Sequence, residues 1–299
     1  MTNIIEIKNL EIAFQKKGEN IQKIIHGIDL DIPRGQIVGI VGESGSGKSI
    51  SMKGIMNILP ENSQLAYDSF EFDGQQIQSN QRNREAIPAA MIFQDPMTAL
   101  NPLRTIGYHL IEVIQRFSKT SKKNATALAI KELEKVGIGL PEKRMNQYPH
   151  ELSGGMRQRI MIAMALLAKP KLLIADEPTT ALDVTIQAQI LNLIRRLQRE
   201  EDLSVILVTH DFGIVAGMCQ SIKVMYQGQI VEEGSTDEIF YEAAHPYTQE
   251  LLKAIPSGEK GQRLYSVGNH SSESVKGNQG KLVNLSPTHR VLKEEAAGK

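Results

Sequence analysis

A glycine-rich segment between residues 42 and 49 has the composition and spacing of a phosphate-binding loop. It reads GESGSGKS and fits the pattern G-x-x-x-x-G-K-[ST] at every position. The glycines let backbone N–H groups curve around phosphates, the lysine reaches the β- and γ-phosphates, and the last hydroxyl binds Mg²⁺. An apolar run precedes the segment and a helical pattern follows it, as such a loop requires. The expected nucleotide-binding residues are Gly42, Glu43, Ser44, Gly45, Ser46, Gly47, Lys48 and Ser49.

Two consecutive carboxylates close a second apolar run. Leu172–Ala175 reads as a buried strand, and Asp176 and Glu177 follow it directly. In nucleotide hydrolases an acid at this place holds Mg²⁺, which is the role expected for Asp176. Glu177 would face the γ-phosphate, where a base must orient the attacking water. The alternative is a strand end with solvated acids, and the loop upstream favours the catalytic interpretation.

The segment LSGGMRQR at residues 152–159 resembles the signature of the ATP-binding-cassette (ABC) ATPases. Ser153, Gly154 and Gly155 open a predicted helix, where exposed N–H groups, a hydroxyl and the helix dipole attract an anion. One nucleotide already has its own loop in this chain. This second anion site therefore makes sense if it completes the γ-phosphate cage of a partner subunit.

Other positions resemble this family in the same order along the chain. The resemblance implies that Phe14 stacks on adenine, although a core aromatic remains the alternative for this residue. It implies that Gln94 is the glutamine that senses Mg²⁺ and water, so the expected metal ligands are Ser49, Gln94 and Asp176.

Two further motifs follow in the family's order. Asp183, in ALD, matches the D-loop, and His210, in THD, matches the histidine that contacts the γ-phosphate. The catalytic residues expected in this way are Glu177, His210 and Gln94.

Three segments narrow the resemblance to the peptide/nickel uptake branch of the family. They are Met156 in the signature, FQDPMTALNP at residues 93–102 and HPYTQELL at residues 245–252. Members of that branch are peripheral ATPases on the cytoplasmic face of the membrane, powering uptake of oligopeptides, dipeptides or nickel. The implied partners are a second, different ATPase subunit, two membrane permeases and an extracytoplasmic binding protein. Several relatives hold an iron–sulfur cluster on tail cysteines, but no cysteine follows Cys219 here, so no cluster is expected.

The segment Gln94–Pro102 is expected to couple the nucleotide site to the permeases. Pro96 and Pro102 stiffen the segment, because proline restricts the backbone. By resemblance, the groove beside it receives a short cytoplasmic helix of a permease. Met97 and Leu100 are the residues expected to carry this coupling. The alternative is a purely structural connector.

Composition excludes several other classes of protein. The 299 residues contain 34 Lys+Arg and 34 Asp+Glu, and this balance argues against binding nucleic acid through a broad basic face. A single cysteine excludes an internal disulfide framework. The longest apolar stretch, Ile160–Ala168, is far shorter than the roughly 18 residues of a membrane span. The N-terminus has no basic region and no small-residue cleavage site, so secretion is not expected.

The elements that must position these residues indicate an α/β fold. Residues 4–7 and 28–32 follow the alternating apolar and polar pattern of strands. The apolar runs at 37–41 and 91–93 and the FEFDG segment at 70–74 also predict strands. A helix is predicted from Ser49 to Leu59, and helical spacing recurs between 105 and 137. From residue 172 strands and helices alternate, which favours a mainly parallel sheet. A capping-box pattern at 235–238 predicts a short helix to Tyr241.

The implied architecture is a P-loop NTPase (RecA-like) core. The core has a mainly parallel sheet, an N-terminal antiparallel β subdomain and an inserted α-helical subdomain. The expected domains are 1–256, with the helical subdomain at about 95–165, and a C-terminal extension at 257–299. The resemblance covers about residues 4–256. Residues 257–280 are rich in Ser, Gly, Asn and Lys and read as a linker.

Three alternatives to a transport motor stay open. An ATPase of the same shape could serve a soluble enzyme complex, such as one that cleaves carbon–phosphorus bonds. A nucleic-acid or translation ATPase of this family normally carries a long coiled-coil insertion or a second cassette, and the sequence has neither. A binding-only cassette is disfavoured because Glu177 and His210 are both present.

Overall fold

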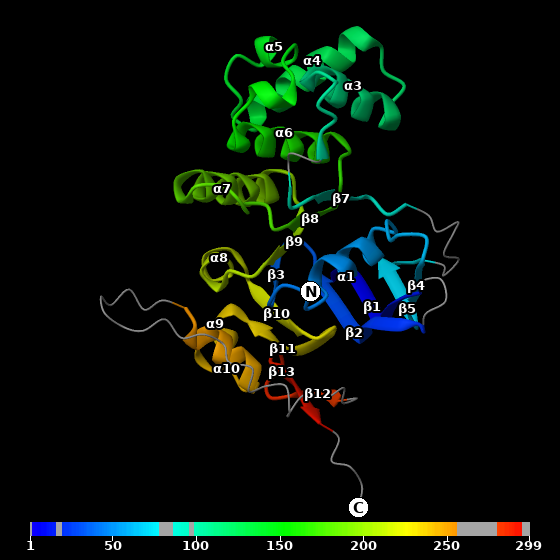
Figure 1. Cartoon of the computed structure of the whole chain (residues 1–299), viewed down its shortest axis with the longest axis vertical. Helices are drawn as coiled ribbons and strands as arrows, with labels where there is room; N and C mark the ends of the chain where they lie inside the picture. Colours follow the sequence, from blue (N-terminus) through cyan, green and yellow to red (C-terminus); the bar gives the residue numbers. More distant parts are fainter. Residues whose placement is uncertain (1, 16–19, 78–85, 96–98, 256–279, 295–299) are drawn as a thin grey trace, which may run out of the picture. The chain divides into compact units, whose positions relative to one another are not determined.

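The computed structural model, shown in Figure 1, describes residues 2–15, 20–77, 86–95, 99–255 and 280–294. The chain divides into two units. The first unit contains residues 1–33, 37–85 and 207–299, and the second contains residues 34–36 and 86–206. The phosphate loop therefore belongs to the first unit, and the acidic pair and the signature belong to the second.

An antiparallel sheet forms the N-terminal part of the first unit. Its long strands are β1 (Asn3–Phe14) and β2 (Gln22–Pro33), joined by β4 (Ser63–Ala66), β5 (Ser69–Phe72) and β6 (Gln75–Gln76). The order is β2-β1-β5-β6, and β4 also pairs with β1. In β2 the side chains of Ile28, Leu30 and Ile32 are buried at alternate positions. This period of two is the pattern that predicted the strand, and the expected antiparallel β subdomain is confirmed.

The same unit contains the strand that leads into the phosphate loop. Every residue of β3 (Ile37–Val41) is buried, and β3 pairs in parallel with β10 (Ser221–Tyr226). Antiparallel strands continue the sheet through β11 (Gln229–Ser235) and the hairpin β12 (Gly280–Asn284) and β13 (Arg290–Glu294). The helices of this unit are α1 (Lys48–Ile55), α8 (Phe212–Met218), α9 (Thr236–Tyr241) and α10 (Pro246–Lys253).

The second unit combines parallel strands with helices. In it β7 (Ala89–Ile92) pairs in parallel with β8 (Leu172–Asp176). The other neighbour of β8 is β9 (Ser204–Thr209), whose last three residues belong to the first unit. The helices are α3 (Ile106–Phe117), α4 (Lys122–Lys135), α5 (Pro141–Arg144), α6 (Gly154–Leu167) and α7 (Val184–Glu200), with a 3-10 turn at Pro149–Glu151. Helices α3, α4 and α6 pack against one another.

Two predictions of local structure differ from the structure. The helix expected to reach Leu59 ends at Ile55, because Asn57 takes a left-handed conformation with a φ of 57°. The linker predicted at 257–280 lies outside the described residues except for Gly280. That glycine begins a hairpin, β12–β13, which the composition of the tail did not indicate.

Charged and polar contacts join the C-terminal hairpin to the sheet of the first unit. The Lys223 ammonium lies 2.5 Å from Glu233 and 3.2 Å from Asp31. Arg290 of β13 donates to Asp31 at 2.9 Å and also contacts Glu233.

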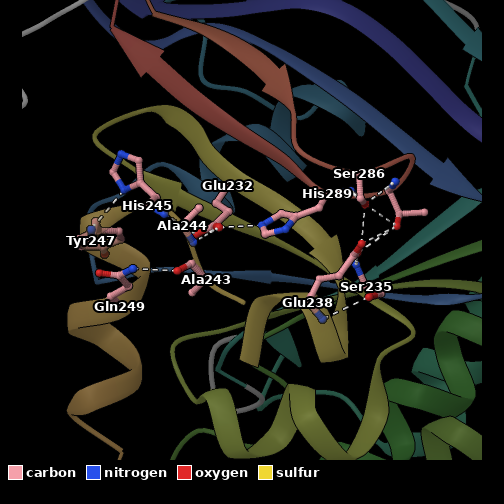
Figure 2. Close-up of polar contacts among 11 residues, drawn as sticks. Glu232, Ser235, Glu238, Ala243, Ala244, His245, Tyr247, Gln249, Ser286 and His289 are labelled. Atoms are coloured by element: carbon pink, nitrogen blue, oxygen red, sulfur yellow. Dashed lines mark hydrogen bonds and ion pairs between the residues drawn. The ribbon is translucent and has the colours of Figure 1, made fainter. Parts of the chain in front are cut away.

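At the hairpin turn, Ser286 and Thr288 donate to the Glu238 carboxylate (Figure 2). Desolvation raises the pKa of Glu238. The hydrogen bonds from Ser286, Ser235 and Thr288 outweigh it and bring the pKa to about 2.

Within the described residues, no helix has both the length and the apolar character needed to cross a membrane.

Candidate functional site

The glycine-rich loop connects β3 to α1, as its sequence predicts. Gly42, Gly45 and Gly47 all have positive φ, at 154°, 84° and 106°. A Cβ atom on Gly42 would lie 2.1 Å from the carbonyl oxygen of Met225, so no larger residue fits there. Gly47 is the left-handed residue at which α1 begins. These glycines therefore allow a curved backbone that larger residues would not adopt.

Lys48 folds back over this loop. Its side chain is buried, and its ammonium donates to the carbonyl oxygens of Gly42 at 2.6 Å and Glu43 at 2.7 Å. The Ser46 hydroxyl accepts a longer hydrogen bond from the same nitrogen, at 3.4 Å. A buried ammonium group inside a curved loop at the start of a helix suits an anionic ligand.

Three other predicted site residues belong to the first unit. Ser49 is half-buried in the first turn of α1, so its hydroxyl lies at the helix start. Phe14 is half-buried at the end of β1 rather than enclosed in the core. His210 is exposed and follows directly on β9. Phe14 is thus less enclosed than the core aromatics Phe70 and Phe72.

The second unit places the two carboxylates in different surroundings. Asp176 is the last residue of β8 and is 3% exposed, whereas Glu177 is half-buried and has a φ of 46°. Gln94 donates from its amide nitrogen to Oε2 of Glu177 at 2.8 Å. These two residues are 83 positions apart, and both were singled out from the sequence. A positive φ at a residue that is not glycine costs energy and is frequent at functional sites.

Thr180 also contacts Glu177 and was not predicted from the sequence. Its hydroxyl donates to the same Oε2 atom at 2.8 Å. The sequence signal for it is weak, because a threonine three residues after an acid is common in turns. Two donors on one oxygen fix the orientation of the Glu177 carboxylate.

The signature segment and the D-loop pack together inside the second unit. Ser153 caps α6 and accepts from Met156 N at 3.3 Å, while Asp183 caps α7 and accepts from Ile186 N at 3.0 Å. A Cβ atom on Gly155 would lie 2.6 Å from Cγ2 of Ile186. Glycine at 155 is therefore required by this packing, in addition to any role toward an anion.

The helices of the second unit form an open groove of about 820 Å³. Its lining is mixed, with apolar, aromatic and charged side chains from α3 and α4, among them Tyr108, Ile111, Glu112, Gln115 and Lys122. Of the two residues expected to couple the site to a permease, Met97 lies outside the described residues. Leu100 is buried, whereas Leu103 nearby is 82% exposed.

The chain matches two protein-family models. Residues 25–180 match the model described as ABC transporter, and residues 231–282 match the model described as oligopeptide/dipeptide transporter, C-terminal region. The first match contains the phosphate loop, the signature and the acidic pair. The second contains most of β11 and the helices α9 and α10.

Curated relatives are similar over most of their length. The oligopeptide transport ATP-binding protein OppD of Bacillus subtilis is 46% identical over 289 residues, which is 95% of this chain and 79% of that protein. The dipeptide transport ATP-binding protein DppD of Escherichia coli is 47% identical over 269 residues, covering 88% of this chain and 82% of the relative.

Two solved structures are similar to this chain in fold. One is cbiO1 from Clostridium perfringens, described as part of the ABC transporter complex cbiONQ, with a TM-score of 0.65 and 26% identity over 81% of this chain and 92% of that one. The other is MJ0796, described as a dimeric post-hydrolysis state bound to ADP and Pi. Its TM-score is 0.65, with 27% identity over 78% of this chain and 98% of that one.

Proposed function

Because the chain belongs to the ABC transporter family, we propose that it is the ATP-hydrolysing subunit of an importer for oligopeptides or dipeptides. The observation that carries this proposal is the joint match of both family models, since the second model describes peptide transporters in particular. The named relatives are themselves peptide-transport proteins at 46% and 47% identity. Nickel is the second candidate cargo, because the resemblance that links the chain to this branch includes nickel importers.

The residues at the loop fit ATP and Mg²⁺ by their chemistry. The curved loop and the buried Lys48 ammonium suit the phosphates, and the half-buried ring of Phe14 offers adenine a surface. The hydroxyl, amide and carboxylate oxygens of Ser49, Gln94 and Asp176 are the hard ligands that Mg²⁺ prefers. When bound, the ion would neutralise phosphate charge.

Glu177 is proposed as the group that takes a proton from the attacking water. Gln94 and Thr180 both donate to its Oε2 atom, which orients the carboxylate for this role. His210, following β9, is proposed to contact the γ-phosphate. These roles rest on the family motif at each position and on the Gln94–Glu177 hydrogen bond.

Two cassettes are proposed to act as a head-to-tail pair, with Ser153, Gly154 and Gly155 of one reaching the nucleotide held by the other. Asp183 supports this segment, because it caps α7, whose Ile186 packs against Gly155. The similar cassette MJ0796 is described as dimeric, in keeping with such a pair. The partner subunit is proposed to be a different paralogue of this chain.

We expect ATP hydrolysis by this chain to rise more than linearly with concentration or on adding its partner ATPase. Below the dissociation constant of a homodimer, doubling the concentration should raise the rate about fourfold, because the active species contains two chains. The rates should be measured over a hundredfold dilution series with ATP in excess. Full-rate hydrolysis by a dilute preparation that is monomeric throughout the series, strictly proportional to concentration, would rule out the shared site.

The permeases are proposed to dock on the groove of the second unit, whose lining begins at Thr105, shortly after the segment Gln94–Pro102 in the sequence. The groove offers aromatic and charged side chains, and Arg104 lies 4.6 Å from the ring centre of Tyr108. Since Leu100 is buried, the exposed Leu103 and Tyr108 are the better candidates for this contact. The chain would then lie on the cytoplasmic face of the membrane, and an extracytoplasmic binding protein would deliver the peptide.

Copurification and uptake test this function directly. In mild detergent the tagged chain should copurify with two integral membrane permeases. Vesicles containing that complex, with ATP on the side of this chain and binding protein on the other, should accumulate a labelled oligopeptide. A complex with soluble enzymes only would favour the carbon–phosphorus alternative instead. Uptake of Ni²⁺ but not of peptide would reassign the cargo.

A further inference from the structure

A tyrosine of the C-terminal region contacts the phosphate loop directly. The backbone N–H of Glu43 donates to the Tyr247 hydroxyl at 3.1 Å, although the residues are 204 positions apart. Tyr247 is 2% exposed, and the centres of its ring and that of Tyr226 are 4.2 Å apart. Burial raises the pKa of the Tyr247 hydroxyl, so the group stays protonated at neutral pH.

This contact fixes the second residue of the loop together with Lys48. The Glu43 carbonyl accepts from the Lys48 ammonium at 2.7 Å, while its N–H is held by Tyr247. Both polar groups of the Glu43 main chain therefore have a partner, and the Glu43 side chain is exposed. The shape of the loop at this point depends on the tyrosine hydroxyl and not on the glutamate side chain.

The start of α10 holds Tyr247 in place. His245 is the residue before this helix, and its Nδ1 atom accepts from the backbone N–H of Tyr247 at 3.2 Å, as Figure 2 shows. Burial lowers the pKa of His245, outweighing the opposite effect of Glu232. The imidazole is therefore neutral near pH 7, which leaves Nδ1 able to accept this bond.

A buried carboxylate anchors the segment that precedes α10. Glu232 on β11 is fully buried, and its two oxygens accept from Ala244 N at 2.6 Å and His245 N at 3.2 Å. His289, at the turn of the C-terminal hairpin, contacts the same carboxylate through Nε2 at 2.8 Å (Figure 2). A continuous series of contacts thus runs from the hairpin through Glu232 and His245 to Tyr247 and the loop.

We propose that Tyr247 is a positioning residue for the nucleotide, which shapes the phosphate loop through Glu43 N–H and is itself held by Glu232 and His289. This inference rests on the proposed ATP site. The hydroxyl acts on the loop in the free enzyme and throughout turnover. It therefore contributes equally to binding the substrate and the transition state. Its loss should change KM for ATP and leave kcat nearly unaltered.

The direct test is Tyr247→Phe, which keeps the buried ring and removes only the hydroxyl. Removing the partner of this part-buried N–H should raise KM for ATP about tenfold, with kcat within about twofold of wild type. Tyr241→Phe is the matched control, because Tyr241 is 85% exposed on the neighbouring helix and should leave both constants unchanged. A lower melting temperature with unaltered KM would show a merely structural role and overturn the proposal.

Glu232→Gln tests whether the buried carboxylate that holds the segment before α10 also affects the nucleotide site. The amide offers one acceptor oxygen where Glu232 offers two, so Ala244 N or His245 N loses its partner. We expect KM for ATP to rise about threefold in the wild-type background and not to rise further in Tyr247→Phe. If the two substitutions together raised KM by the product of their separate effects, Glu232 would act independently of Tyr247. If Tyr247→Phe does not fold, an unchanged KM in folded Glu232→Gln rejects the proposal.

Lys48→Ala separates this inference from the proposed function. If wild type binds no ATP, or binds it no more tightly than Lys48→Ala does, the proposed ATP site is wrong. A second outcome is that wild type binds ATP and Lys48→Ala does not, while Tyr247→Phe has the same KM for ATP as wild type. In that case the ATP site is correct and the positioning role of Tyr247 is rejected.

Discussion

Glu177→Gln is expected to retain ATP binding and to lose turnover. The amide has nearly the shape of the carboxylate and keeps an oxygen that can accept from Gln94 and Thr180, so the local contacts survive. What the substitution removes is the ability to take a proton from water. On the usual magnitude of general base catalysis, kcat should fall about 10²- to 10⁴-fold while the Kd for ATP changes little.

The measurements for Glu177→Gln are single-turnover hydrolysis and equilibrium binding of ATP on the same preparation. Asp237→Asn is a suitable control, since it also neutralises an acid but on the exposed face of α9. If Glu177→Gln hydrolysed ATP at close to the wild-type rate, the proton would go elsewhere and the base assignment would be wrong. A variant that lost binding as well would point to a structural role for this carboxylate.

The sequence predicts the phosphate loop well because everything that determines it is local. The glycines, Lys48 and Ser49 lie within eight positions, between a buried strand and a helix, and the structure has this order. The alternation in β2 and the apolar run of β3 are equally local signals, so these strands appear where they were expected. The end of α1 was misjudged, because the apolar spacing continues past Asn57 although the backbone there is left-handed.

Contacts between distant segments could not be predicted in the same way. Gln94 was identified by resemblance and Glu177 from the acidic pair that closes an apolar run, but their hydrogen bond depends on how β7 and β8 pair, which no short motif encodes. Thr180 and Tyr247 were missed for the same reason. The hairpin β12–β13 follows a polar segment, and its strands are five residues long. Its attachment relies on buried charges such as Glu232 and Lys223 that look like ordinary surface residues in the sequence.

Lys48→Ala is expected to weaken ATP binding more than any other single change in the loop. The buried ammonium is the positive charge that the motif brings to the β- and γ-phosphates, and the loop already encloses it. Removing one partner of a buried charge pair costs about 2–5 kcal/mol, which corresponds to a Kd about 30- to 4,000-fold higher. Calorimetric titration with a non-hydrolysable ATP analogue measures this change without interference from turnover.

Two further variants separate the charge of Lys48 from its effect on the shape of the loop. Lys48→Met keeps most of the side-chain length but cannot donate to Gly42 and Glu43, and Lys53→Ala removes a charge from the same helix outside the loop. If the charge matters most, Lys48→Met should bind as weakly as Lys48→Ala, and Lys53→Ala should bind like wild type. Binding by Lys48→Met within about threefold of wild type would show that the ammonium does not contact the phosphates, since an ion pair in a buried site is worth far more than this.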